Sequence, residues 1–442
     1  MKKLTKEQIY KRLNNEEDAR ACKAIDNNAC QEVPGNFIIL LISQLFSKFA
    51  DALLNPKITL PWLMQSLNVP ASFIAWLVPI RESGSLLPQL AIANVIRKLP
   101  VRKWVWVIGA VMQAGCILAM VAVAFTLKGA QAGYAIIGLL ILFSLARGFN
   151  SVAAKDVLGK VIPKQQRGNI SGLAASIAGF ATLTFGLLMW FFSQQKDQDI
   201  VIIALLLGAL MWLIAAFFYA QINEYSGATE GANNGLLHAF SKLKILYQDK
   251  QFAHFVITRA LLLCSALSAP FYIILASKQS FEFSLLATFI AVSGFASLVS
   301  APIWGRLSDL SSQRVLVLSA TLVTINGLAV FVIATWYNEL LLNWWAMPIL
   351  YFLLSVAHQG VRLGRKTYLV DMAEGNKRTD YVSVSNTVIG VLLLMLGSIG
   401  LLESFLSTAE LILLYSGLGF LGGNECTVFT KNRVNSVLFN LM

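Results

Sequence analysis

The stretch VIIALLLGALMWLIAAFFYA, residues 201–220, contains no charged side chain and has the length of a bilayer crossing. About 20 residues of α-helix are enough to cross the hydrocarbon layer of a membrane. Lipid offers no partner to an unpaired backbone group, so a helix is the form that such a stretch takes there. The stretch therefore predicts a membrane-spanning helix.

The rest of the chain repeats this pattern. Of its 442 residues, 57% are hydrophobic and 13% are charged, which is too apolar for a soluble globule. The hydrophobic residues fall into twelve blocks: 36–56, 71–93, 104–127, 132–154, 169–193, 199–221, 251–276, 283–304, 315–337, 344–363, 381–402 and 409–423. We therefore expect an all-α polytopic membrane protein with twelve transmembrane helices in two six-helix bundles.

A long polar connection divides the spans six and six. The expected parts are a cytoplasmic N-terminal tail (1–35), an N-terminal six-helix bundle (36–221), a cytoplasmic linker (222–250), a C-terminal six-helix bundle (251–423) and a C-terminal tail (424–442). Within the last tail, residues 430–442 are expected to be poorly ordered. Residues 5–13 of the first tail have the spacing of a short amphipathic helix, and a solvated tail fits the same residues.

Basic residues are concentrated in alternate connections. If the N-terminus is inside, the inner connections hold Arg97, Lys98, Arg102, Lys103, Lys155, Lys160, Lys164, Arg167, Lys242, Lys244, Lys250, Arg306, Arg314, Arg362, Arg365, Lys366, Lys377 and Arg378. The outer connections hold only Lys57, Lys128, Lys196 and Lys278. The positive-inside rule predicts a multi-pass protein of the inner (cytoplasmic) membrane with both termini cytoplasmic. We attribute the net charge of +12 to this topology and to anionic lipid, and not to nucleic acid.

The two halves resemble each other at a shift of 211 residues. This shift places Lys48 of the first span on Arg259 of the seventh, and NVIRKLPVRK (94–103) on GRLSDLSSQR (305–314). Several matches at one offset indicate a duplicated six-helix unit. Such repeats are typical of transporters that bind their substrate between the halves.

Two motifs resemble those of the major facilitator superfamily. The connection between spans 8 and 9 resembles the superfamily's loop signature through Gly305, Leu307, Ser308, Asp309 and Arg314. Arg147, followed by small residues in LARGFNSVAA, resembles the helix-4 motif. The resemblance implies two bundles around a central cavity that opens alternately to either side, with Gly305, Asp309 and Arg314 in a gating loop.

The chain also departs from that pattern. In the first copy of the loop signature, Asn94 replaces the glycine and Lys98 replaces the acid, which puts a charge lock in the first half in doubt. Span 5 has no Gly-Pro pair, so it does not resemble the drug:proton antiporters of the superfamily.

Away from their ends, the predicted spans hold six charged residues: Lys48, Asp51, Arg81, Glu82, Arg147 and Arg259. Such residues usually face a cavity or one another, because lipid does not solvate them. Arg81 and Glu82 are adjacent and point in different directions around the helix. Their depths predict two pairs between helices, Arg81–Asp51 and Glu82–Arg147. Asp51 or Glu82 would carry a coupling proton; alternatively, the pairs only tie the first bundle together.

Lys48 and Arg259 then have no acidic partner. Because the repeat relates them, we expect them to face each other across the cavity and, together with Arg81, to bind an anionic substrate. Alternatively, Lys48 pairs with Asp51 and Arg259 extends to the inner surface. His358, Arg362 and Asp371 are assigned to cytoplasmic gating contacts or to lipid head groups, and not to the site.

Three functions fit these features. The first is a secondary transporter of a small, possibly anionic solute, coupled to protons. The second is an efflux antiporter of amphipathic compounds, which span 5 opposes. The third is a membrane transferase, for which the outer loops offer no acid–base or metal cluster.

No cofactor or metal is expected. The five cysteines lack metal spacing, and the glycine pattern at 417–422 lies in a span with no strand before it. We therefore expect a monomeric carrier, not an enzyme, whose partners are its substrate, the proton and the lipid bilayer.

Overall fold

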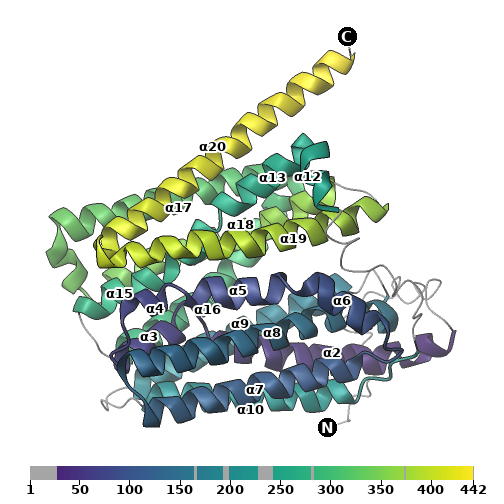
Figure 1. Cartoon of the computed structure of the whole chain (residues 1–442), viewed down its shortest axis with the longest axis horizontal. Helices are drawn as coiled ribbons and strands as arrows, with labels where there is room; N and C mark the ends of the chain where they lie inside the picture. The colour runs from purple at the N-terminus through teal and green to yellow at the C-terminus, as the bar shows by residue number, and fades with distance from the viewer. Residues whose placement is uncertain are drawn as a thin grey trace, which may run out of the picture.

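The computed structural model describes residues 27–163, 167–192, 199–226, 242–279, 283–372 and 375–441. All regular structure in these ranges is helical, as the apolar blocks predict. Figure 1 shows the helices running along one common direction, with the first half of the chain mainly below the second half. The segment 5–13 and most of the linker lie outside the described residues.

The first half makes six passes, of which the first two are interrupted. Its helices are α2 (Asn27–Leu53), α3 (Thr59–Ser66), α4 (Ala71–Ile74), α5 (Leu77–Leu86), α6 (Gln89–Arg97), α7 (Lys103–Thr126), α8 (Gly129–Val161), α9 (Arg167–Phe192) and α10 (Asp199–Ala220).

The second half repeats this plan, and its first pass is also interrupted. Its helices are η3 (Lys242–Lys244), α12 (Ile245–Gln248), α13 (Lys250–Leu261), α14 (Cys264–Leu267), α15 (Ala269–Gln279), α16 (Phe283–Leu310), α17 (Ser312–Trp336), η4 (Asn338–Leu342), α18 (Ala346–Met372), α19 (Gly375–Gly397), η5 (Ser398–Ser404) and α20 (Thr408–Leu441).

Within the described residues, nine helical segments are long and apolar enough to cross a membrane. The other three passes of the twelve-span plan are α4–α6, α18 and α20. The first is broken into short helices, and α18 and α20 carry polar and charged side chains along part of their length. These passes depend on contacts with other helices, because a span that carries charge is not favoured by lipid alone.

The first pass extends beyond its predicted end. Pro56 lacks a backbone N–H and follows the end of α2, and the chain resumes as α3 in the same pass. Asn55 Oδ1 accepts a hydrogen bond of 2.9 Å from the Lys57 N–H within the break. Lys57 therefore lies inside a pass, where it meets the second half, and the prediction that it belongs to an outer connection is wrong.

α18 also extends beyond the predicted span 344–363. It continues to Met372, so Arg362, Arg365 and Lys366 are helical and not part of a connection. The apolar block ends early because these side chains interrupt it, whereas the helix does not need an apolar residue at every position. The predicted span therefore ends too early along this helix.

The chain after Gly423 continues as a helix. α20 runs to Leu441 without a break, whereas the sequence predicts that the last bundle helix ends at residue 423 and that residues 430–442 are poorly ordered. No Gly or Pro follows Gly423 to end the helix. Figure 1 shows the C-terminal part of α20 extending beyond the other helices.

The halves meet along close helix pairs. A Cβ on Gly186 of α9 would lie 2.5 Å from the Ala291 nitrogen of α16, and one on Gly294 would lie 2.7 Å from the Leu183 nitrogen. Small residues at these points let the two backbones approach, as they do in other membrane helix pairs. We call the end of the bundle with residues 98–102 and 221–226 the basic end. The opposite end holds residues 67–70 and 337–345.

Glu224 links several segments of the first half at the basic end. Its buried carboxylate accepts the N–H groups of Arg102 and Lys103 at the start of α7, and the ammonium of Lys160 at 2.7 Å. Arg102 also pairs with Asp156 at 3.0 Å. A negative group at a helix N-terminus is favoured by the unpaired N–H groups there. A charge lock thus exists in the first half, and its central acid is Glu224.

Replacing Glu224 by glutamine is expected to destabilise the first half by about 2 kcal/mol, because three charge-assisted hydrogen bonds weaken at once. A thermal melt of the purified protein measures this loss. Glu425→Gln is the matched control, since that side chain is 41% exposed and contacts only His254 among the ion pairs of the described residues. Equal melting temperatures for the two variants would contradict the role given to Glu224.

Candidate functional site

Asp51 of α2 lies between two guanidinium groups. Arg81 of α5 donates to Asp51 Oδ1 at 2.8 Å, and Arg147 of α8 donates to Oδ2. The predicted Arg81–Asp51 pair is therefore present. The predicted Glu82–Arg147 pair is not formed in the described part of the chain, where Arg147 pairs with Asp51 instead. The three residues join helices of the first half into one polar unit.

Glu82 is exposed, although it lies in the middle of the second pass. It interacts electrostatically with Arg81, Arg147, Lys57 and Arg365. No described cation lies within 4.0 Å of its carboxylate. Glu82 is thus a carboxylate in a basic environment without a fixed partner.

Arg259 of α13 is buried against α19. Its Nη1 donates to Ser385 Oγ at 2.6 Å and its Nη2 donates to Asn386 Oδ1 at 3.0 Å. Asn386 in turn donates to Gln89 Oε1 of the first half at 3.3 Å. Arg259 is only 8% exposed, so the alternative in which it extends to the surface is wrong. Its guanidinium donates hydrogen bonds to neutral oxygens, and no carboxylate of the described chain pairs with it.

Lys48 is half-buried and forms no ion pair with Asp51 among the described residues. From the second half it interacts electrostatically with Arg362 and Lys366. Arg259 instead interacts with Arg365. The structure therefore does not show Lys48 and Arg259 as a facing pair: the cations that face Lys48 from the other half come from α18.

α18 supplies the site residues that the sequence analysis placed elsewhere. One side of α18 carries four basic or titratable side chains: His358, Arg362, Arg365 and Lys366. Successive members are four, three and one positions apart, which keeps all four within one sector around the helix axis. His358 contacts Lys57 across the halves, and Arg365 interacts with Glu82. The structure thus places His358 against Lys57 of the first half and Arg362 within electrostatic range of Lys48, and not in separate contacts at the cytoplasmic surface. The spacing of these four residues along the helix could have indicated from the sequence that they lie together.

We call this group the central charged cluster. Its members in the described chain are Lys48, Asp51, Lys57, Arg81, Glu82, Arg147, Arg259, His358, Arg362, Arg365 and Lys366. Eight of these side chains are basic and two are acidic. A surplus of positive charge between low-dielectric walls attracts anions.

The family model of the Major Facilitator Superfamily matches residues 40–423. The chain belongs to this superfamily. It is accordingly a multi-pass membrane transporter for a small-molecule substrate, and the transferase interpretation is excluded. No curated protein matches the chain by sequence.

Solved structures of the Major Facilitator Superfamily share the fold. The nucleoside transporter NupG has a TM-score of 0.62 at 14% identity, and the match covers 89% of this chain and 99% of NupG. A POT family transporter in complex with 5-aminolevulinic acid has a TM-score of 0.69 at 10% identity, covering 90% and 96%. The inward-open xylose transporter XylE from E. coli has a TM-score of 0.65 at 10% identity, covering 90% and 96%.

The residues of the superfamily loop signature lie at the end of α16 and at the start of α17, and Ser311 alone connects the two helices. Gly305 is near the end of α16, and Ser311 caps α17 by accepting the Arg314 N–H at 3.3 Å. Ser308 donates to Thr367 of α18 at 2.7 Å, which ties the loop to the neighbouring helix. Arg314 is exposed, and the side chain of Asp309 lies outside the described residues. The gating role of this loop stays a prediction.

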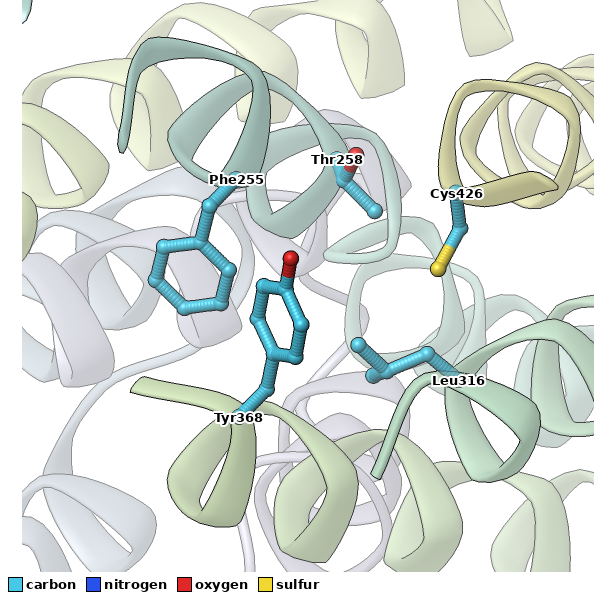
Figure 2. Close-up of a pocket in the computed structure, with 5 residues that line it drawn as sticks. All are labelled: Phe255, Thr258, Leu316, Tyr368 and Cys426. Carbon is cyan, nitrogen blue, oxygen red and sulfur yellow. The ribbon is translucent and has the colours of Figure 1, made fainter. Parts of the chain in front are cut away.

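Two pockets lie away from the central charged cluster. Figure 2 shows the first, lined by Phe255, Thr258, Leu316, Tyr368 and Cys426, with a volume of about 10 Å³. That is barely room for one water molecule, so it is a packing gap and no solute site. The second, about 370 Å³, is an apolar groove between α17 and α20 next to the exposed Ile325 and Phe420.

Proposed function

We propose that this transporter carries a small anionic solute, coupled to protons, by alternating access to a site between its halves. The observation that supports the proposal is the charge of the central cluster, with eight basic side chains against two acidic ones in the described chain. Burying a cation at membrane depth costs free energy unless an anion pairs with it or water solvates it. A bound phosphate or carboxylate could pair with several of these cations.

The anion site would be formed by Lys48 and Arg259, one from each half. Neither has a carboxylate partner among the described residues, and Arg259 presents a buried guanidinium that neutral oxygens hold in place. Arg81 is neutralised by Asp51, so we assign it to positioning this site and not to contact with the solute. Arg362 and Lys366 would add positive potential opposite Lys48.

Glu82 would carry the coupling proton. Asp51 is poorly suited to the task, because two arginines hold it in the charged form. Glu82 has no such fixed partner and is exposed. A carboxylate with several cations within electrostatic range can exchange its proton as those cations move.

Replacing Glu82 by glutamine is expected to abolish solute accumulation driven by a pH gradient, because glutamine has no titratable proton. Exchange of solute for solute should continue, since it needs no net proton movement. Uptake into proteoliposomes, with and without a pH gradient, measures both activities. Glu339→Gln, at an exposed turn of the opposite end, is the matched control. Normal accumulation by the Glu82 variant would remove the residue from the coupling step.

The orientation follows from the basic residues. The basic end would face the cytoplasm of an inner membrane, with both termini on that side. A monomer would suffice for transport, since one chain supplies both halves. Cysteine labelling of exposed positions from either side of the membrane tests the orientation: Lys98→Cys should react only from the cytoplasmic side, and Phe405→Cys only from the other side.

Uptake by wild-type protein tests the function itself. Proteoliposomes are given labelled organic phosphates and carboxylates, their uncharged parent compounds, and an amphipathic cation. We expect uptake of an anion, stimulated by a pH gradient. The structural neighbours include carriers described as transporting nucleosides and xylose. Uptake of an uncharged parent compound alone would overturn the proposal of an anionic solute, and uptake of the cation alone would favour efflux of amphipathic compounds.

A further inference from the structure

A chain of polar contacts joins the two halves through one histidine. Lys57, in the break between α2 and α3, lies with its Nζ 2.8 Å from His358 Nε2 on α18. His358 Nδ1 lies 3.0 Å from Ser265 Oγ on α14. Lys57 comes from the first half, and both other residues come from the second.

The hydrogen-bond partners determine where the proton of this imidazole lies. Ser265 Oγ donates to the Leu262 carbonyl at 3.0 Å, because a carbonyl oxygen can only accept. With its hydrogen used there, Ser265 Oγ can only accept from His358, so Nδ1 carries the N–H. In the neutral ring Nε2 then holds a lone pair, which accepts a hydrogen bond from the Lys57 ammonium.

The contact is therefore compatible with one charge state of His358. A proton on Nε2 would remove the lone pair and place an imidazolium against the Lys57 ammonium. The groups that face the pair would not relieve this repulsion on the α18 side, because Arg362 and Arg365 are also basic. The carboxylate that interacts with Lys57 is Glu82 of α5, which offers the ammonium another partner within the first half.

The Lys57–His358 contact also lies between the two halves, which must separate at the opposite end when the transporter opens there. Beyond it, toward the opposite end, Ser277 of α15 donates to Gln65 of α3, so the halves touch again. Loss of the Lys57–His358 contact would remove a charged link between the halves, and toward the opposite end the neutral Ser277–Gln65 hydrogen bond would remain.

We propose that His358 is a proton-binding site of the transport cycle, and that Lys57 releases the second half when His358 takes up a proton. This inference rests on the proposed proton-coupled cycle and adds a second titratable group to Glu82. Protonation at Nε2 breaks the N–H···N bond to Lys57, the ammonium moves to Glu82, and the opposite end becomes free to open. Ser265 is a positioning residue, because it fixes which nitrogen accepts the proton.

The test is a distance between spin labels at the opposite end, one on each half. Cysteines are introduced as Asn68→Cys and Glu339→Cys, both at exposed positions. Cys22 and Cys30 are replaced by serine, while the buried Cys116, Cys264 and Cys426 remain. The protein is measured in lipid nanodiscs at pH 8 and pH 5 without any solute, so that the result is independent of what the transporter carries.

In this label pair on the otherwise wild-type chain, we expect the population with the longer distance to rise at least about fivefold from pH 8 to pH 5. Most of the rise should come at the acid end of this range, because Lys57, Arg362 and Arg365 oppose protonation of His358. His358→Gln is the decisive variant. Its amide oxygen can accept from Lys57 and its amide nitrogen can donate to Ser265, so both contacts remain and neither titrates. It should stay closed at both pH values. Lys57→Met should be open at both, and Lys128→Met, which removes an exposed lysine at the opposite end, should behave like the wild type.

Either of two results would overturn the proposal: a wild-type distance distribution that does not change with pH, or a His358→Gln protein that opens at low pH as the wild type does. If the wild-type protein takes up no anion but its distance distribution changes with pH as expected, the proposed substrate is wrong and the proposed proton site stands.

Discussion

Asp51→Asn is expected to be among the most destabilising single substitutions in this protein. It removes the charge that neutralises Arg81, whose side chain is 5% exposed, and it also releases Arg147. Breaking a buried ion pair by removing one partner costs about 3–5 kcal/mol, because the other charge stays buried. We place the effect near the lower value, since Arg147 is partly exposed. Thermal unfolding of the purified protein measures the loss.

Two further variants separate this explanation from a general sensitivity of the chain. Asp156→Asn removes a carboxylate that also pairs with an arginine, but this carboxylate is 36% exposed, so the loss should be smaller. Asp51→Asn combined with Arg147→Gln removes one of the two stranded charges and should recover part of the stability. Equal losses of stability for Asp51→Asn and Asp156→Asn would show that the buried ion pair stabilises the protein no more than the exposed pair does.

Lys48→Ala and Arg259→Ala are each expected to weaken binding of the anionic solute by about 2–5 kcal/mol, which corresponds to roughly 30-fold to several-thousand-fold in Kd. The reason is that each variant removes a cation which, in the described chain, has no carboxylate of its own. Binding titrations with the solute identified by uptake measure the change. Topology should be unaffected, because the basic connections remain.

The control for these two variants is Lys128→Ala, which removes an exposed lysine outside the cluster. Its solute affinity should equal that of the wild type. If Arg259→Ala binds the solute normally, Arg259 only links α13 to α19 through Ser385 and Asn386. If Lys48→Ala also binds normally, the two residues related by the repeat are not the anion site.

Much of the fold could be predicted because the bilayer imposes a strong length rule on apolar segments. Blocks such as 201–220 have no alternative to a helix, and the polar linker separates the halves. The interrupted passes could not be placed in this way. The break before Lys57 and the charged side of α18 both reduce local hydropathy, so each looked like the end of a span.

The site was predicted in part for a related reason. Depth along a helix brings Arg81 and Asp51 to the same level, and the structure contains that pair. Depth says nothing about rotation around the helix axis, which decides whether Arg147 meets Glu82 or Asp51. Rotation also decides that α18 faces Lys48 and Lys57. The spacing of His358, Arg362 and Arg365 along one helix face was present in the sequence and would have indicated it.

The most direct test of the central claim is a melting screen of the purified transporter against matched pairs of compounds, each pair consisting of an organic phosphate or carboxylate and its uncharged parent. A ligand that binds the folded state raises the melting temperature by an amount that grows with the logarithm of its concentration relative to its Kd. We predict that at least one anion stabilises the wild-type protein, that its parent does not, and that Lys48→Ala abolishes the shift. Stabilisation by the uncharged parent to the same extent, retained in Lys48→Ala, would contradict an anion site between the halves.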